Sequence, residues 1–109
     1  MQDHPEKIDQ KELYVVLTEV KVKPGTAMKV LELFKATNPA LVESQEDWIN
    51  ADFSVSENED IVVVRAKWRK KSSYRAFSES KNFKEVMGRF GKYFLEKPSV
   101  RIFTVLFEM

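Results

Sequence analysis

The chain has 109 residues, with 43% hydrophobic and 32% charged side chains, a length and composition typical of one folded domain. Its 18 basic and 17 acidic residues nearly cancel and are spread along the sequence, which argues against a nucleic-acid-binding surface. The absence of cysteine excludes disulfides, thiol catalysis and zinc–thiolate sites, and the one histidine, His4, lies in a polar N-terminal stretch.

This N-terminal stretch, residues 1–11, is expected to be a disordered leader that precedes a single domain over residues 12–109. No apolar run approaches the roughly 20 residues that span a bilayer, and the leader lacks the apolar segment of a signal peptide. We therefore expect no membrane partner and a cytoplasmic location.

The first predicted element is a strand over residues 13–22, which is rich in valine and is followed by the turn sequence KPG. Apolar side chains occur at both parities of this strand, so both of its faces need cover. Thr26 is then expected to cap a helix whose apolar residues recur at helical spacing. Pro39 is expected to end or kink that helix near Thr37.

A hairpin is predicted next, with strands at 48–55 and 61–69 joined by the turn sequence SENED. The first of these strands alternates between apolar and polar residues, so its two faces differ. The predicted apolar face carries Ile49, Ala51, Phe53 and Val55, and the opposite face carries Trp48, Asn50, Asp52 and Ser54.

A second helical region is predicted over residues 74–96, capped by Ser72 or Ser73 and interrupted near the sequence SESKN. Pro98 lies beyond its end, and a fourth strand over residues 99–108 has apolar residues at both parities.

The order β-α-β-β-α-β predicts an α+β fold of the ferredoxin-like, split-βαβ type, with both helical regions on one face of a four-stranded antiparallel sheet. The first and fourth strands would leave an apolar second face, and a second copy of the chain is expected to cover it. The sequence therefore predicts a homodimer in the form of a dimeric α+β barrel, with a small-molecule pocket between sheet and partner in each half.

Three features of the sequence follow one another along the chain: KPGT at 23–26, Trp68 at the end of the third predicted strand, and SKNF at 80–83. Together with the order of elements, over roughly residues 12–108, they resemble the antibiotic biosynthesis monooxygenase family. The resemblance implies a dimeric α+β barrel that holds a small molecule, and it does not fix the reaction.

Some members of this family are cofactor-independent monooxygenases that oxidise polyaromatic phenols to quinones, and the resemblance places Trp68 and Tyr74 at their catalytic positions. These enzymes carry an asparagine four residues before the tryptophan, where this chain has Val64, which makes no side-chain hydrogen bond. Asn50, on the neighbouring strand, is a candidate replacement. Asp52, if buried there, would have a raised pKa and would accept a proton from a phenol or enol.

The haem-degrading members of the family have an asparagine, a second tryptophan and an iron-binding histidine at positions that correspond here to Thr18, Phe77 and Met87. None of the three matches, so we expect no haem, no metal and no other cofactor. The candidate site residues are thus Trp68 and Tyr74 for catalysis and, for substrate binding, Asn50, Asp52, Val64, Phe77 and Met87.

Three functions stay open at this point. The first is an enzyme that oxidises or isomerises a planar, aromatic or enolisable substrate in a pocket under Trp68. The second is a non-catalytic, small-molecule-binding or stress-associated dimer that lacks the catalytic set. The third is a structural dimerisation unit whose pocket is filled by its own side chains, with Trp68 and Tyr74 serving only as packing residues.

Overall fold

The computed structural model describes residues 12–109, so the predicted leader and His4 lie outside the described residues. Four strands, three α-helices and one 3₁₀ turn follow one another along this part of the chain. They are β1 (Leu13–Lys21), α2 (Ala27–Val42), β2 (Trp48–Val55), β3 (Ile61–Trp68), α3 (Lys71–Ser78), α4 (Lys81–Phe90), η1 (Gly91–Tyr93) and β4 (Ser99–Val105).

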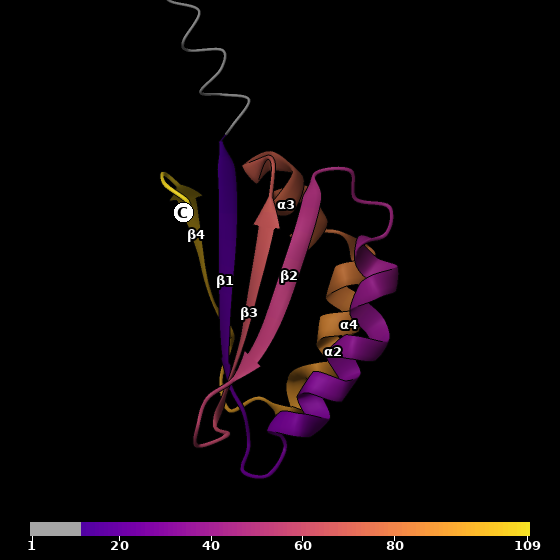
Figure 1. Ribbon diagram of the computed structural model, residues 1–109. Helices are drawn as coiled ribbons and strands as arrows, with labels where there is room; N and C mark the ends of the chain where they lie inside the picture. Colours follow the sequence, from indigo (N-terminus) through magenta and orange to yellow (C-terminus); the bar gives the residue numbers. More distant parts are fainter. Residues whose placement is uncertain (1–11) are drawn as a thin grey trace, which may run out of the picture.

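The strands form one antiparallel sheet in the order β2-β3-β1-β4, and the helices lie on one face of it (Figure 1). The predicted ferredoxin-like α+β fold is therefore confirmed. Strand β1 is a central strand of the sheet because it pairs with both β3 and β4. The register of each pairing fixes which side chains share a face.

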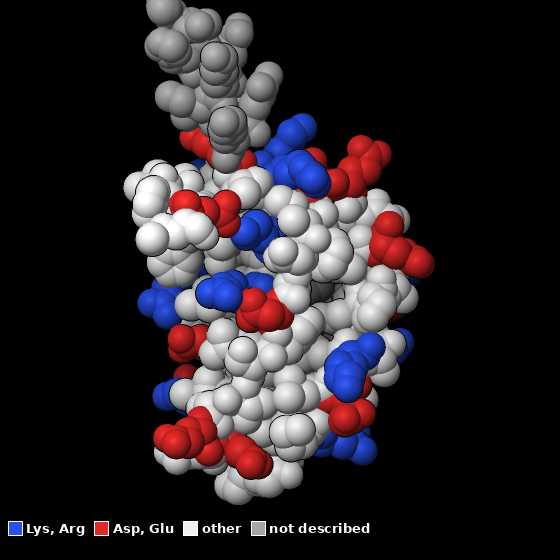
Figure 2. All heavy atoms as spheres, in the orientation of Figure 1, with Lys and Arg blue, Asp and Glu red and all other residues white. Residues whose placement is uncertain are grey.

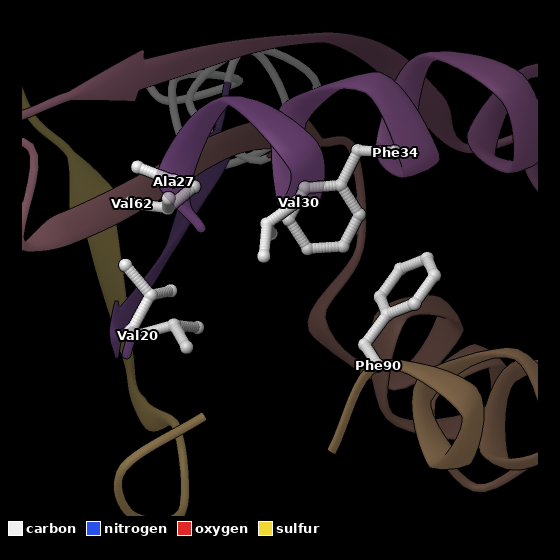
Figure 3. Close-up of a cluster of buried hydrophobic side chains, with 7 residues drawn as sticks. Val20, Ala27, Val30, Phe34, Val62 and Phe90 are labelled. Atoms are coloured by element: carbon white, nitrogen blue, oxygen red, sulfur yellow. The ribbon is translucent and has the colours of Figure 1, made fainter. Parts of the chain in front are cut away.

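The hydrophobic core lies between the helices and one face of the sheet. Val20 of β1 and Val62 of β3 are register partners and are fully buried beneath α2. Figure 3 shows Phe34 of α2 directed toward Phe90 of α4, and the two rings meet nearly edge to face with centroids 4.8 Å apart. These contacts hold α2 and α4 against the sheet as one apolar layer.

Helix α2 does not end near Thr37, so an end at that residue, one of the two outcomes expected from Pro39, is wrong. The helix continues through Pro39 to Val42, and the backbone N–H of Glu43 donates to the Pro39 carbonyl. Proline removes one backbone donor and usually breaks a helix. Here the helix continues for one more turn, which carries the partly buried residues Leu41 and Val42.

The second helical region is divided as expected. Helix α3 ends at Ser78, and Ser80 caps α4 by accepting a hydrogen bond of 3.2 Å from the backbone N–H of Phe83. Neither Ser72 nor Ser73 caps α3, because the helix already begins at Lys71. The Ser73 hydroxyl instead donates to the Asp47 carboxylate, which ties α3 to the segment that precedes β2.

The other face of the sheet, here called the outer face, carries no helix (Figure 1). It combines apolar side chains with ion pairs such as Arg65–Asp52 and Arg101–Glu19. Its apolar members are Leu13, Val15, Leu17, Ile61, Val63, Phe103 and Val105. In Figure 2 acidic and basic side chains are interspersed over the visible surface, with no extended area of one sign.

Within residues 12–109, no helix has both the length and the apolar character that crossing a bilayer requires.

Candidate functional site

A cavity of about 640 Å³ lies between the helix-facing side of the sheet and helices α2, α3 and α4. Its volume is in the range of small-molecule binding sites, and its walls are mainly apolar. The sheet contributes Val16, Thr18, Trp48, Ala51, Phe53, Val64, Ala66 and Trp68, and the helices contribute Phe34, Asn38, Tyr74, Phe77, Phe83 and Met87, among others. The sequence predicted a pocket between the sheet and a partner subunit, whereas this cavity forms within one chain.

Trp68 is the last residue of β3 and lines this cavity although it is only 1% exposed. Its indole Nε1 is buried and has no hydrogen-bond partner among the described residues. Buried indole N–H groups normally find an acceptor, because leaving one unpaired costs free energy. An oxygen atom of a ligand in the cavity would supply that acceptor.

Tyr74 lies in the first turns of α3, beside Trp68. The two rings pack nearly edge to face, with centroids 5.8 Å apart and an interplanar angle of 68°. Burial raises the pKa of the Tyr74 phenol, and a hydrogen bond with the Ser78 side chain opposes part of that rise. The phenol is therefore neutral at physiological pH and can act as a hydrogen-bond donor.

Two phenylalanines extend the aromatic wall of the cavity away from Trp68. The Phe77 ring lies 5.3 Å from the Trp68 ring between centroids, and the Phe83 ring lies 5.0 Å from Phe77. Met87 of α4 also lines the cavity. A wall of tilted and edge-to-face rings of this kind favours a planar, aromatic ligand.

Trp48 also lines the cavity, and the sequence did not predict this. The β2–β3 ladder shifts register between Trp48 and Asn50, so Trp48 lies opposite Trp68 on the helix-facing side. Strict alternation had placed Trp48 with Asn50 on the polar face, but a bulge changes the parity of the residues on one side of it. The one available signal was the size of the indole, which is costly to leave exposed.

The structure does not bring Asn50 and Asp52 together with Trp68. Their register partners are Lys67 and Arg65, so both side chains lie on the outer face, and both residues are exposed. Asp52 Oδ2 accepts hydrogen bonds from Arg65 Nε at 3.2 Å and Nη2 at 3.1 Å. The reason is the two-residue period of a strand, which sends these side chains away from the cavity.

The other candidates do meet. Trp68, Tyr74, Val64, Phe77 and Met87 all line the one cavity. Among residues 12–109, no group of three or more acidic or histidine side chains is placed to hold a metal ion.

A second hollow, of about 510 Å³, lies between the end of α4 and residues 94–98. It shares Phe83 and Met87 with the first cavity, and Lys84 and Lys97 lie at its edge. Trp68, whose buried indole N–H has no partner among the described residues, lines the first cavity and not the second, and for this reason the first cavity is the candidate site.

These features define a ferredoxin-like α+β domain with an aromatic-lined cavity between its sheet and its helices. The chain belongs to the antibiotic biosynthesis monooxygenase family, whose model matches residues 13–89.

Solved structures share this fold at low sequence identity. A monooxygenase from Streptomyces coelicolor in complex with nanaomycin D has a TM-score of 0.79 and 18% identity, covering 88% of this chain and 89% of that one. A conserved protein from Methanosarcina mazei has a TM-score of 0.75 and 18% identity, with coverages of 89% and 96%. A protein from Mycobacterium tuberculosis has a TM-score of 0.73 and 14% identity, with coverages of 88% and 97%. At the level of sequence, no curated protein matches the chain.

Proposed function

We propose that the chain is an enzyme of the cofactor-independent monooxygenase type, which oxidises a small, planar aromatic or enolisable substrate in the cavity beside Trp68. The observation that carries this proposal is the buried, unpartnered Nε1–H of Trp68 at an aromatic cavity of about 640 Å³. Membership of the family and the nanaomycin D complex of a Streptomyces coelicolor relative support the same substrate class.

The residues of the cavity would act by binding and orienting the substrate. Trp68 Nε1–H and the neutral Tyr74 hydroxyl would donate to a substrate oxygen and favour its enolate or phenolate form. Hydrogen bonds to a charged oxygen contribute about 1.5–3 kcal/mol each. The apolar walls would exclude water and hold the ring plane against the indole.

The reaction that fits this arrangement takes its electrons from the substrate. A ring CH₂ in its enolate form reacts with dioxygen, and one oxygen atom enters the substrate as a new carbonyl. The second oxygen atom leaves as water with the two hydrogens of the CH₂ group. Four electrons pass from substrate to dioxygen, so the equation balances with no further reductant.

The proposed assembly is a homodimer in which the outer faces of two sheets pack together. Val15 and Val63 on this face are only partly buried in the single chain, although both are apolar. Pairing two copies through the outer face would remove this apolar area from water and would produce the dimeric barrel that the resemblance implies.

A second function, a non-catalytic small-molecule-binding protein, is favoured by one observation. Val64 lines the cavity where the phenol-oxidising members of the family have asparagine, and its isopropyl group offers a substrate no hydrogen bond. Such a protein would keep the cavity and bind the same ligands without consuming oxygen.

Oxygen uptake with a dihydroxyanthracene-type phenol tests the proposal. We expect uptake by the native protein and a fall in kcat/KM of about tenfold to a hundredfold in Trp68→Phe and in Tyr74→Phe, because each variant loses one hydrogen-bond donor. Tyr93→Phe is the matched control, since Tyr93 lines neither cavity. Unchanged uptake in both cavity variants would remove these residues from the mechanism, and binding without uptake would favour the second function.

A further inference from the structure

Thr18 is a polar residue on the otherwise apolar floor of the cavity. It lies in the middle of β1, on the helix-facing side, between Val16 and Val20. Its hydroxyl makes no hydrogen bond to any other part of residues 12–109. Because Thr18 lines the apolar cavity, a ligand oxygen in the cavity can satisfy its hydroxyl, which both donates and accepts.

The register of the sheet places Thr18 directly beside Val64. The two residues are partners in the β1–β3 ladder, and both side chains line the cavity. Side chains of directly opposed residues have Cβ atoms about 4.5–5.5 Å apart. Thr18 therefore lies next to Val64, and its hydroxyl can offer the polar contact that the isopropyl group of Val64 lacks.

Thr18 and Trp68 are well separated on the cavity floor. Val64 precedes Trp68 by four residues on β3, and four residues of strand span about 13 Å. Phe53, the register partner of Val64 on β2, also lines the cavity, and its ring lies 5.5 Å from the Phe34 ring between centroids. An elongated polycyclic molecule would lie along the strand, with one end at Trp68 and the other at Thr18.

We infer that Thr18 binds a second ligand oxygen, at the end of the molecule opposite the oxygen that Trp68 Nε1–H holds. The inference rests on the proposed function for the position of the ligand, and it narrows the ligand class to elongated polycyclic aromatics that carry oxygen near both ends. A ring system without oxygen at the Thr18 end would gain nothing from the hydroxyl.

The test compares two probes that the protein does not need to turn over: a dihydroxyanthraquinone and unsubstituted anthracene. Binding is measured by quenching of tryptophan emission. In Thr18→Val, which keeps the shape of the side chain, we expect the dissociation constant for the dihydroxyanthraquinone to rise about threefold to tenfold. Anthracene binding is expected to stay within about twofold, since it makes no hydrogen bond.

Two further variants control the measurement. Thr18→Ser keeps the hydroxyl and is expected to restore quinone binding to within about twofold. Thr104→Val removes the same hydroxyl from a threonine on β4 that does not line the cavity, and it is expected to change neither probe.

The inference is overturned if Thr18→Val weakens both probes equally, if it weakens neither, or if the native protein binds neither probe. These outcomes are separate from the fate of the proposed function, because quinone binding that depends on Thr18 would stand even if the native protein consumed no oxygen.

Discussion

Trp48 lies directly opposite Trp68 across the β2–β3 ladder, so both tryptophans of the chain line the same cavity. This pairing depends on the register shift between Trp48 and Asn50, which turns Trp48 toward the helices. Because the chain has only these two tryptophans, all of its tryptophan emission originates beside the cavity.

A polycyclic aromatic ligand is therefore expected to quench both tryptophans. Emission from Trp68 alone is measured in Trp48→Phe, and emission from Trp48 alone in Trp68→Phe. Trp48→Leu is expected to weaken binding by about 0.5–1.5 kcal/mol, since it removes one aromatic contact. A tryptophan whose emission does not respond to saturating ligand would show that its ring does not face the bound molecule.

Trp68→Phe is expected to change stability little and binding strongly. The variant loses part of a large buried ring, but it also removes an N–H group whose unpaired burial costs about 1–3 kcal/mol. We expect a net change in the free energy of unfolding of about 1 kcal/mol, against about 3–5 kcal/mol for Trp68→Ala, which leaves a cavity. Urea unfolding measures both values.

The difference in unfolding free energy between Trp68→Phe and Trp68→Ala tests whether the indole N–H of Trp68 is unpaired. If Trp68→Phe were as destabilising as Trp68→Ala, the indole N–H would have a partner in the folded protein, and the argument that it awaits a ligand oxygen would fail.

The fold could be predicted because the spacing of apolar residues and the order of the elements can both be read directly from the sequence. Alternation over 48–55, helical spacing after Thr26 and the break before Ser80 all correspond to elements in the structure. Pro39 misled the prediction of a helix end because its local cost is visible in the sequence, whereas the partial burial of Leu41 and Val42 in the last turn is not.

The site was predicted only in part, because the sequence did not show which face of the sheet each strand residue would lie on. Trp68, Tyr74 and Val64 were assigned to one cavity and do share it. The cavity lies on the helix-facing side of the sheet, to which Trp68 points. Asn50 pairs with Lys67 and therefore lies on the opposite face. Trp48 was missed because the register shift beside it is a property of the paired strands, which alternation in one strand does not reveal.

Tyr74 predicts a dependence of stability on alkaline pH. Burial raises the pKa of its phenol above the ordinary value of 10.0, so the folded protein holds this proton when the unfolded chain has begun to release it. Stability is thus fully present below pH about 10 and falls as pH rises from there through the folded-state pKa. Tyr74→Phe is expected to lose stability less steeply than the native protein in this window.

Urea unfolding at several pH values from about 8 to 11 measures the difference, and it spans the ordinary pKa of tyrosine. Tyr93→Phe controls for the general effect of removing a phenol. Parallel pH profiles for the native protein and Tyr74→Phe would contradict a raised pKa at this position.

Two residues of β4 give a matched test of the proposed dimer. Phe103 is 45% exposed and Val100 is 47% exposed, yet their register partners, Val15 and Thr18, lie on opposite faces of the sheet. If two copies pack through the outer face, Phe103 becomes buried in the interface, whereas Val100 does not.

A carboxylate buried without a partner costs about 3–5 kcal/mol. Phe103→Asp is therefore expected to raise the dimer dissociation constant more than a hundredfold, and Val100→Asp to leave it nearly unchanged. Sedimentation at micromolar concentration distinguishes the two species. A native protein that sediments as a single chain, or equal dissociation of both variants, would mean that the outer face does not bind a second copy.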